Sequence, residues 1–495
     1  IFTGLVLSFQ NVTAQFSEYA IQISQTDPTF GSTARMQAIG GAQASLGADL
    51  STLSVNPAGL GFLNRSVMSF TPSLNFADTE TSFEGSRTGN YSTNFNFANL
   101  GVAFNTNPGK YSSEKFKGGS FAITLQRNNT FNNEFIYQGR NTQNSITDFF
   151  IEDANQFGAT FDADEVTFLS DYAYSQFLIE QADSYLIEPN PQGGTDIYPQ
   201  GDFEGFTSLV GARSGFNPRQ TERVTTSGNN YGLNFAWGGN YNDQIYFGAG
   251  LSFKTINYSR TRNYTEDQFT NGEGVVDDLV NSIQINEEER LTGTGVDFNA
   301  GLIVRPIDFI TLGVSYTSPT FYSLDREREF RIRTDMSSEY YYYDEGSGED
   351  SLYFQLGYFD SNNDPELPAP PLFIDQFNLR TPSKLTVGAS GFIGKFGFVT
   401  ADVEYINYGS AFIKSDDLSA DQADNDDISG SYSSTFNYRV GGELRLDAFR
   451  VRGGYGFFGD FDDRDGYDSS RDQYSFGLGY RQRDFFIDLA FVHRN

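Results

Sequence analysis

The chain has 495 residues, no cysteine, one histidine and a formal net charge of −31. The acidic charge excludes the attraction to phosphates on which nucleic-acid binding depends, and the lack of cysteine excludes disulfide and thiolate chemistry. No apolar run approaches the ~18 residues that a transmembrane helix needs. Phenylalanine (49) and tyrosine (29) are abundant, as is typical of proteins with aromatic girdles at membrane interfaces.

The first residues look like the second half of a secretory signal. Residues 1–9 are mostly apolar, and Val12-Thr13-Ala14 supplies small residues of the kind that precede a cleavage site. We therefore expect a signal-peptide remnant at 1–14 and a mature chain that begins at Gln15. The alternative is that the apolar residues form a first strand.

Residues 15–65 lack any two-residue alternation of apolar and polar side chains. They are rich in alanine and glycine between Ala34 and Gly47, and Asn56-Pro57-Ala58 follows. We expect a compact segment here that is separate from the strands.

Apolar and polar residues alternate in the rest of the chain, 66–495. Near the end, Tyr474, Phe476 and Leu478 alternate with Ser475 and Gly477. Such a strand is apolar on one face and polar on the other. Thirteen such strands are predicted, near 68–76, 91–104, 118–137, 231–237, 245–253, 296–302, 310–316, 380–393, 396–408, 433–446, 448–458, 472–482 and 484–493.

Short turns and long segments alternate strictly between these strands. The long segments are 138–226, 261–290, 323–379, 409–432 and 459–471. Bacterial outer-membrane barrels have short periplasmic turns, long external loops and an even number of strands. The pattern therefore predicts an all-β, antiparallel transmembrane barrel of about 14 strands, the last of which would lie beyond Asn495.

The largest of these segments contains two stretches of predicted helix, at 146–157 and 164–181, both with aromatic residues. They would either form a cap over the mouth of the barrel or bury only the core of their own loop. The sequence leaves both interpretations open.

Charged residues of both signs fall on the polar face of the strands, where they would point into the lumen. Arg439, Arg450, Arg452 and Glu443 are the main candidates. They would form a paired network that braces the N-terminal segment, since confined charges need partners. Alternatively, one of the arginines would receive a substrate carboxylate, which the planar guanidinium suits.

The stretch from Ala34 to Ala42, followed by Asn56-Pro57-Ala58-Gly59-Leu60, resembles the amino-terminal hatch of the FadL-type outer-membrane transporters of long-chain fatty acids and other hydrophobic compounds. Later strands, such as Tyr474 to Phe491, look like members of this family in the Bacteroidota. The resemblance implies a fourteen-stranded barrel with an internal hatch at 15–65. It also implies passive, hatch-gated transport of hydrophobic small molecules and a sideways exit near the third strand, where Gly118, Gly119, Asn128 and Asn129 would allow a bend.

On the same resemblance, the hatch residues that control gating are Asn56, Pro57 and Ala58, with Gly40 and Gly41. Without it, Asn-Pro-Ala would be only a turn, in which proline fixes φ and asparagine accepts a local hydrogen bond. The expected partners are a hydrophobic substrate and the lipid and lipopolysaccharide of the bacterial outer membrane.

No catalytic, metal or cofactor site is predicted. His493 is the only imidazole and stands at the end of the last strand, and the loop around Asp463 does not fit a calcium-binding pattern. The alternative function is a non-transporting accessory of a secretion or surface assembly, similar to type IX secretion, with envelope proteins as partners. A continuous apolar pocket would favour transport, and a lumen filled by polar side chains would favour the accessory role.

Overall fold

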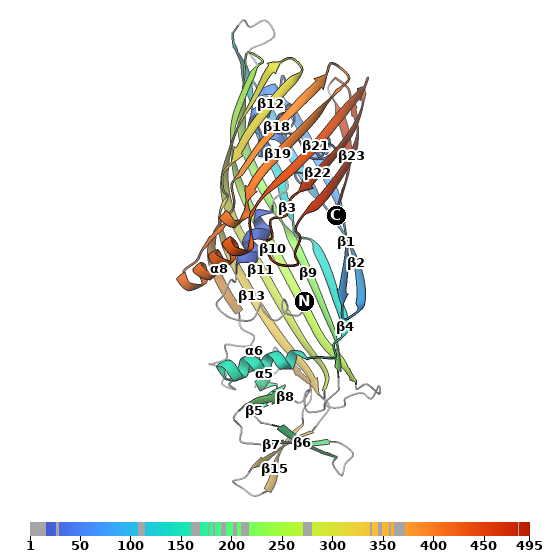
Figure 1. The fold of residues 1–495 in the computed structure, drawn as a ribbon, viewed down its shortest axis with the longest axis vertical. Coiled ribbons are helices and arrows are strands. Elements are labelled where there is room, and N and C mark those ends of the chain that lie inside the picture. The colour runs from blue at the N-terminus through green and yellow to red at the C-terminus, as the bar shows by residue number, and fades with distance from the viewer. Residues whose placement is uncertain are drawn as a thin grey trace.

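The computed structural model (Figure 1) describes residues 16–25, 29–106, 114–159, 169–176, 178–181, 184–189, 195–200, 205–208, 217–270, 280–336, 339–344, 349–355, 358–360, 372–483 and 485–495. The predicted signal remnant at 1–14 lies outside these residues, as does part of the second predicted helix.

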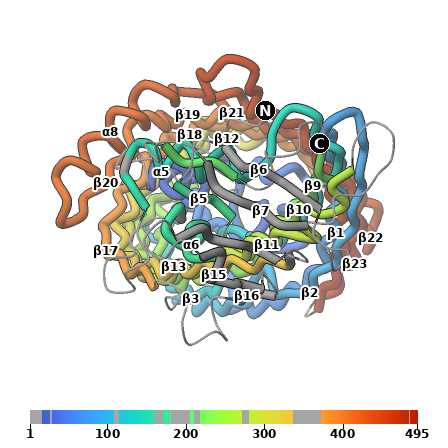
Figure 2. The backbone as a smooth tube through the Cα atoms, turned by 90° about the horizontal axis from the view of Figure 1, so that it is seen from below, coloured from blue at the N-terminus to red at the C-terminus, as the bar shows by residue number. Residues whose placement is uncertain are grey.

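The wall is one antiparallel sheet in which each strand pairs with the next along the chain. Its strands are β1 (Val67–Phe83), β2 (Ser86–Asn105), β3 (Phe116–Thr130) continued by β4 (Asn133–Arg140), β9 (Asn217–Tyr241), β10 (Ile245–Thr270), β11 (Val280–Ile307), β12 (Ile310–Thr317) continued by β13 (Phe321–Met336), β17 (Leu372–Arg380) continued by β18 (Lys384–Ile393), β19 (Gly397–Asn407) with β20 (Phe412–Lys414), β21 (Ser434–Leu446), β22 (Phe449–Phe458), β23 (Arg471–Arg481) and β24 (Phe486–Arg494). All thirteen predicted strands are present. Figure 2 shows them wrapped around a filled interior. The fourteenth strand stays a prediction.

The outward face of the wall is an apolar belt, as the alternation predicts. Leu312 is 44% exposed and Leu478 50%, whereas Ser475, on the opposite face, is 8% exposed. An exposed apolar surface of this extent is what lipid would cover. No helix in the described part of the chain is long and apolar enough to cross a membrane.

Several strands are longer than predicted, and the segments predicted as loops are correspondingly shorter. Strand β9 begins at Asn217, inside 138–226, while β10 and β11 leave only 271–279 between them. Strands β13 and β17 likewise extend into 323–379. The physical reason is that these strand ends project beyond the apolar belt. Their outward faces are polar there, whereas buried apolar residues such as Ile283 and Phe330 lie on the inward faces. The outward apolar residues that mark a strand in lipid are therefore missing.

The long connections contain further short elements. Besides the helix α8 (Leu418–Ser431) and the turn η2 (Tyr408–Ser410), they are β5 (Ile179–Gln181), β6 (Ser184–Pro189), β7 (Thr195–Gln200), β8 (Phe206–Ser208), β14 (Glu339–Asp344), β15 (Glu349–Gln355) and β16 (Tyr358–Asp360).

Two helices lie across the strand ends at the end of the barrel that carries the long connections, α5 (Ile146–Phe157) and α6 (Leu169–Ser175) (Figure 1). Phe150 is fully buried in a cluster that includes Ile283 of β11 and Phe330 of β13. The helices therefore pack on the wall as a cap. They do not bury only their own loop.

Candidate functional site

The N-terminal segment fills the lumen, inside the strands in Figure 1. It contains α2 (Ser17–Ser24), α3 (Ala34–Gln37), α4 (Thr52–Val55) and η1 (Pro57–Phe62). We call residues 29–63 the hatch and treat α2 separately, because the two parts contact the wall in different ways.

The hatch lies directly against the backbone of the wall because glycines leave room for it. A Cβ added at Gly248 of β10 would lie 2.5 Å from the carbonyl carbon of Pro57. One added at Gly301 of β11 would collide with the side chain of Asn56, and one at Gly313 of β12 with the carbonyl of Ala44. On the other side of the lumen, Gly441 and Gly454 receive Ile39 in the same way. The hatch and the wall therefore fit each other backbone to backbone.

Asn56 holds the turn of the Asn-Pro-Ala motif and is completely buried. Its Oδ1 accepts a hydrogen bond from the backbone N–H of Ala58 (3.1 Å), and its Nδ2 donates to the carbonyl of Ala44 (2.6 Å). Pro57 occupies the first position of η1, where a missing N–H costs no hydrogen bond. The motif thus joins two parts of the hatch and faces β11.

The glycines Gly40 and Gly41 form a second turn of the hatch. Their φ angles are +69° and +78°, a conformation that favours glycine. A Cβ on Gly40 would also lie 3.1 Å from the carbonyl oxygen of Tyr455 in β22. Both glycines therefore meet a backbone requirement at the contact with the wall.

The predicted luminal charges separate into two groups. Arg452 donates to Glu443 (2.8 Å) and Asp488 (2.6 Å), and Glu443 lies 3.7 Å from Arg35 of the hatch. The buried Arg439 donates to Glu404 (2.7 Å). The first group joins the hatch to the wall through Arg35, and the Arg439–Glu404 pair lies between two strands of the wall.

Arg450 does not join these charges. It donates to the carbonyls of Asp447 and Phe449 at the exposed turn between β21 and β22. The structure therefore does not bring Arg450 together with Arg439 and Arg452.

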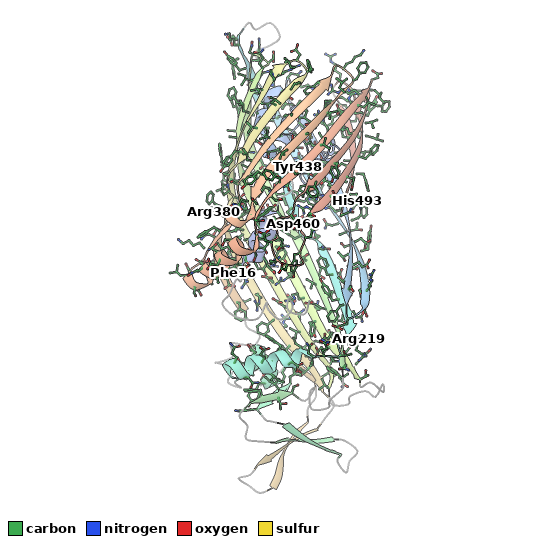
Figure 3. All side chains as sticks on the ribbon, in the orientation of Figure 1. Phe16, Arg219, Arg380, Tyr438, Asp460 and His493 are labelled. Carbon is green, nitrogen blue, oxygen red and sulfur yellow. The ribbon has the colours of Figure 1, made fainter. Side chains whose placement is uncertain are left out.

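Helix α2 lies in an aromatic and aliphatic section of the lumen, which we call the α2 chamber. The chamber is lined by the inward residues Phe131, Ile256, Tyr258, Leu291, Tyr322, Leu324, Phe377, Leu379, Ala411, Ile413 and Ile428. Phe16, Tyr19, Ala20 and Ile23 fill it, and Figure 3 shows Phe16 within the wall. Residues of β10, β11, β13, β17, β20 and α8 thus form an apolar space that the chain's own N-terminal helix occupies.

A second, smaller space separates α2 from the hatch. This cavity of about 70 Å³ lies between Ile23 and Ser54, and most of its lining is polar. Lys254 and Asp297 form an ion pair there, and Thr320 Oγ1 donates to Asp297 (2.8 Å). Such a space is well below the ~300 Å³ of ordinary ligand pockets, so it suits a few waters.

Sequence reasoning missed Arg127 of β3. It falls in the outward phase with Phe121 and Leu125, yet it is only 1% exposed, and its Nε and Nη1 have no hydrogen-bond partner within the described structure. Its guanidinium stands 5.7 Å from the centre of the Phe30 ring. An arginine at a position where the alternation places lipid-facing residues could have indicated that β3 is irregular there.

The buried carboxylate Asp424 was also missed, whereas Asp402 lies on the luminal face that the alternation predicts, but its partners were not predicted. Asp402 accepts from the backbone of Gln43 (2.6 Å) and Ala44 (2.8 Å), and Asp424 from that of Phe16 (2.8 Å). No local sequence pattern predicts these hydrogen bonds, because donor and acceptor lie hundreds of residues apart in the chain.

The wall beside Arg127 is irregular. Pairing of β2 with β3 ends at Asn99 and Gln126, and the register of β3 with β9 shifts at Phe116/Gly119 and again at Arg127/Asn129. These shifts coincide with the bend predicted for the third strand. His493 lies away from Phe16 and the lumen, on the exposed face of β24 (Figure 3).

Comparison with known proteins identifies similar folds only. No protein-family model matches the sequence, and no curated protein matches it. A FadL homologue from Pseudomonas aeruginosa has a TM-score of 0.49 at 13% identity, over 94% of this chain and 89% of that one. The monoaromatic hydrocarbon channel CymD gives 0.46 at 10%, over 94% and 93%. The toluene transporter TodX from Pseudomonas putida gives 0.45 at 12%, over 93% and 92%. At these identities, function has to come from the residues of this chain.

Proposed function

We propose that the chain is an outer-membrane channel through which small hydrophobic molecules pass, and that its N-terminal segment is the gate. The observation that carries the proposal is the α2 chamber. Its lining joins Tyr258 of β10, Leu324 of β13 and Phe377 of β17 into an apolar space inside a wall whose outer face is also apolar. Barrels of this size ordinarily have a polar interior, so an apolar section suits an apolar solute.

A solute could leave the lumen along the barrel axis or sideways through the wall, and the two routes require different rearrangements. The hatch blocks the periplasmic end, where Asn56 and Ala44 lie against Gly301 and Gly313. Because the hatch lies directly against the glycines of the wall there, a solute moving along the axis would have to displace the whole hatch. A sideways exit near β3 needs less rearrangement, and it is supported by the end of the β2–β3 pairing at Asn99 and Gln126. Movement would be passive, down a concentration gradient.

The outer surface of the barrel supports a location in the bacterial outer membrane. The apolar belt would contact lipid, and the polar strand ends with the α5–α6 cap would lie among the sugars of lipopolysaccharide. The residues around the lumen suggest no reaction, since the charged groups at Arg452 and Glu443 already pair with each other. We propose a transport protein and no enzyme.

The accessory role in secretion or surface assembly remains the second candidate, and one observation favours it. The cavity between α2 and the hatch is about 70 Å³ in volume and is lined by polar side chains such as Lys254 and Asp297, so they interrupt the apolar lining of the lumen. In this second role the barrel would be a closed platform, and the partners would bind its external connections.

Uptake by cells separates the two candidates. A bacterial strain that expresses the chain and a matched strain with an empty vector would receive radiolabelled toluene, a long-chain fatty acid and a hydrophilic sugar. We expect faster uptake of at least one apolar probe and unchanged uptake of the sugar. Equal uptake of every probe, together with loss of a surface-displayed protein when the gene is deleted in its own host, would favour the accessory role.

A further inference from the structure

The aromatic residues of α2 are held in the α2 chamber as a small aromatic molecule would be. The Phe16 ring stacks on Phe377 at 4.3 Å between centroids, and the Arg326 guanidinium lies 4.6 Å from the centre of the Phe16 ring. The Tyr19 ring meets Tyr258 edge-on at 6.2 Å. These are the favourable geometries of aromatic and cation–π pairs.

The hydroxyl of Tyr19 has a specific acceptor at the end of the chamber. It donates a hydrogen bond to Glu289 of β11, whose side chain is fully buried. Arg260 forms an ion pair at 2.8 Å with the other oxygen of the same carboxylate, so it does not occupy the oxygen that Tyr19 contacts. Burial raises the pKa of Tyr19 well above its ordinary value, so the hydroxyl keeps its proton and remains a donor. The chamber therefore has a site for an aromatic ring and, beside it, the Glu289 carboxylate as hydrogen-bond acceptor for one neutral hydroxyl.

Helix α2 depends on its surroundings for its own conformation. It has only eight residues, and no side chain of its own caps its N-terminus. Asp424 of α8 accepts from the backbone N–H of Phe16 and of Ser17 instead. Helices shorter than about 12 residues are marginal in isolation, so α2 loses its structure when it leaves the chamber. In contrast to the hatch, α2 contacts the wall through side chains. A bound ligand could make the same ring contacts and the same hydrogen bond in their place.

We propose that α2 is an internal ligand of the substrate chamber, and that the substrate that displaces it is a phenol, an aromatic ring with one neutral hydroxyl group. The proposal rests on the channel function above and specifies the chemistry of its substrate. An aromatic hydrocarbon would fill the ring site but would not donate to the Glu289 oxygen that the Tyr19 hydroxyl contacts. A site built to bind a hydroxyl discriminates strongly against the analogue that lacks it.

Binding to the full chain in detergent tests the proposal with three probes of nearly equal shape: 4-propylphenol, propylbenzene and 4-propylanisole. Only the first can donate to Glu289. We expect titration calorimetry to show that 4-propylphenol binds at least about tenfold more tightly than the other two, the ratio that corresponds to one charge-assisted hydrogen bond. Equal affinity for 4-propylphenol and 4-propylanisole would overturn the proposal.

Competition with α2 is tested by Tyr19→Phe, which keeps the ring and removes the hydroxyl. The apparent affinity of a ligand rises with the fraction of protein whose site is open. The variant should therefore bind 4-propylphenol about tenfold more tightly than the parent. The matched control is Tyr438→Phe on the lipid-facing side of β21, which should change nothing. An unchanged or weaker affinity in Tyr19→Phe would contradict the internal-ligand role.

An engineered disulfide provides an independent test of the proposal. It can be introduced cleanly because the chain has no cysteine of its own. In the double variant Ser17→Cys/Asp424→Cys, a disulfide would hold α2 against α8. Oxidation should abolish 4-propylphenol binding, and dithiothreitol should restore it. The single variants should not respond to either treatment. Equal binding in both redox states of the cross-linked protein would refute the proposal.

Uptake measured in parallel distinguishes this inference from the function on which it rests. If phenol binding competes with α2 but no probe enters cells, the chamber is assigned correctly and the channel function is wrong. If apolar probes enter cells but 4-propylphenol neither binds preferentially nor competes with α2, the channel function holds and the chamber assignment is wrong.

Discussion

Asp424 accepts a hydrogen bond from the backbone N–H of Phe16 at 2.8 Å, although 408 positions separate the two residues. It also accepts from Ser17 at 3.1 Å. An external connection of the barrel therefore caps the helix that occupies the lumen. Any event that moves α8 acts directly on α2.

This contact should respond to pH. Burial raises the pKa of Asp424 to about 6, and the nearby Asp427 and Asp421 act in the same direction, against the two backbone N–H groups. In the unfolded chain the value would be about 3.9. Between these values the folded state holds a proton that the unfolded state has lost, so the free energy that favours burying Asp424 against α2 falls as the pH rises from about 4 to 6, by up to ~3 kcal/mol.

Hydrogen exchange of the α2 amides, corrected for intrinsic rates, would measure this effect. Protection should be greater at pH 4.5 than at pH 7 in the parent, and it should not change over this range in Asp424→Asn. An equal pH dependence in Asp424→Asn would show that another group is responsible.

Asn56→Ala should loosen the hatch and leave the wall intact. The change leaves the Ala44 carbonyl and the Ala58 N–H without their partners, and each buried unsatisfied group costs ~1–3 kcal/mol. The strands keep their own hydrogen bonds. We expect higher ion conductance in planar bilayers and normal heat-modifiable migration on gels. Asn242→Ala, at an exposed turn, is the control, and a conductance no higher than that control would argue against the gating role of Asn56.

Arginine on the lipid face should destabilise the barrel. Leu312→Arg and Leu478→Arg should each cost ~2–4 kcal/mol near the membrane midplane, measured as a shift of the denaturant midpoint for folding into lipid vesicles. Gly313→Ala should act differently, because its Cβ would collide with the Ala44 carbonyl of the hatch. If Leu478→Arg folds as well as the parent, the lipid face is misassigned.

The orientation is checked with single cysteines. Leu418 of α8 is 79% exposed, so Leu418→Cys should react with an impermeant maleimide on intact cells. Asp308→Cys, in the short turn between β11 and β12, should react only after the outer membrane is permeabilised. Labelling of Asp308→Cys on sealed cells would reverse the orientation.

The sequence predicted the wall well because lipid enforces a strict alternation. In β23, Phe476 and Leu478 face outward while Ser475 faces the lumen, as their order requires. The sequence predicts loops at the extended ends of β10 and β11, because that constraint stops where the lipid stops. Cap helix α5 was recognisable from its own residues, including the Ser145 capping box.

The interior was less predictable, because its contacts join distant parts of the chain. Helix α2 is short, and its cap comes from Asp424, so no local pattern marks it. Of the arginines predicted to face the lumen, Arg439 and Arg452 form ion pairs in two separate groups, and Arg450 donates to the carbonyl of its own turn. The turn at Asn56 was singled out only by its resemblance to known hatches, since proline and asparagine occur in many turns.

The long strands place the mouth of the barrel far from the lipid. Strand β11 runs from Val280 to Ile307, but its outward residues become apolar only at Val296. At ~3.4 Å per residue, the polar part extends roughly 50 Å along the strand. Together with the cap on its end, this stalk is long enough to cross the carbohydrate layer of an outer leaflet. In the orientation that the cysteine labelling tests, phages, antibodies and solutes would first meet α5, α6 and the tips of β10 and β11, and conditions in the medium, more than those at the lipid surface, would act on the cap.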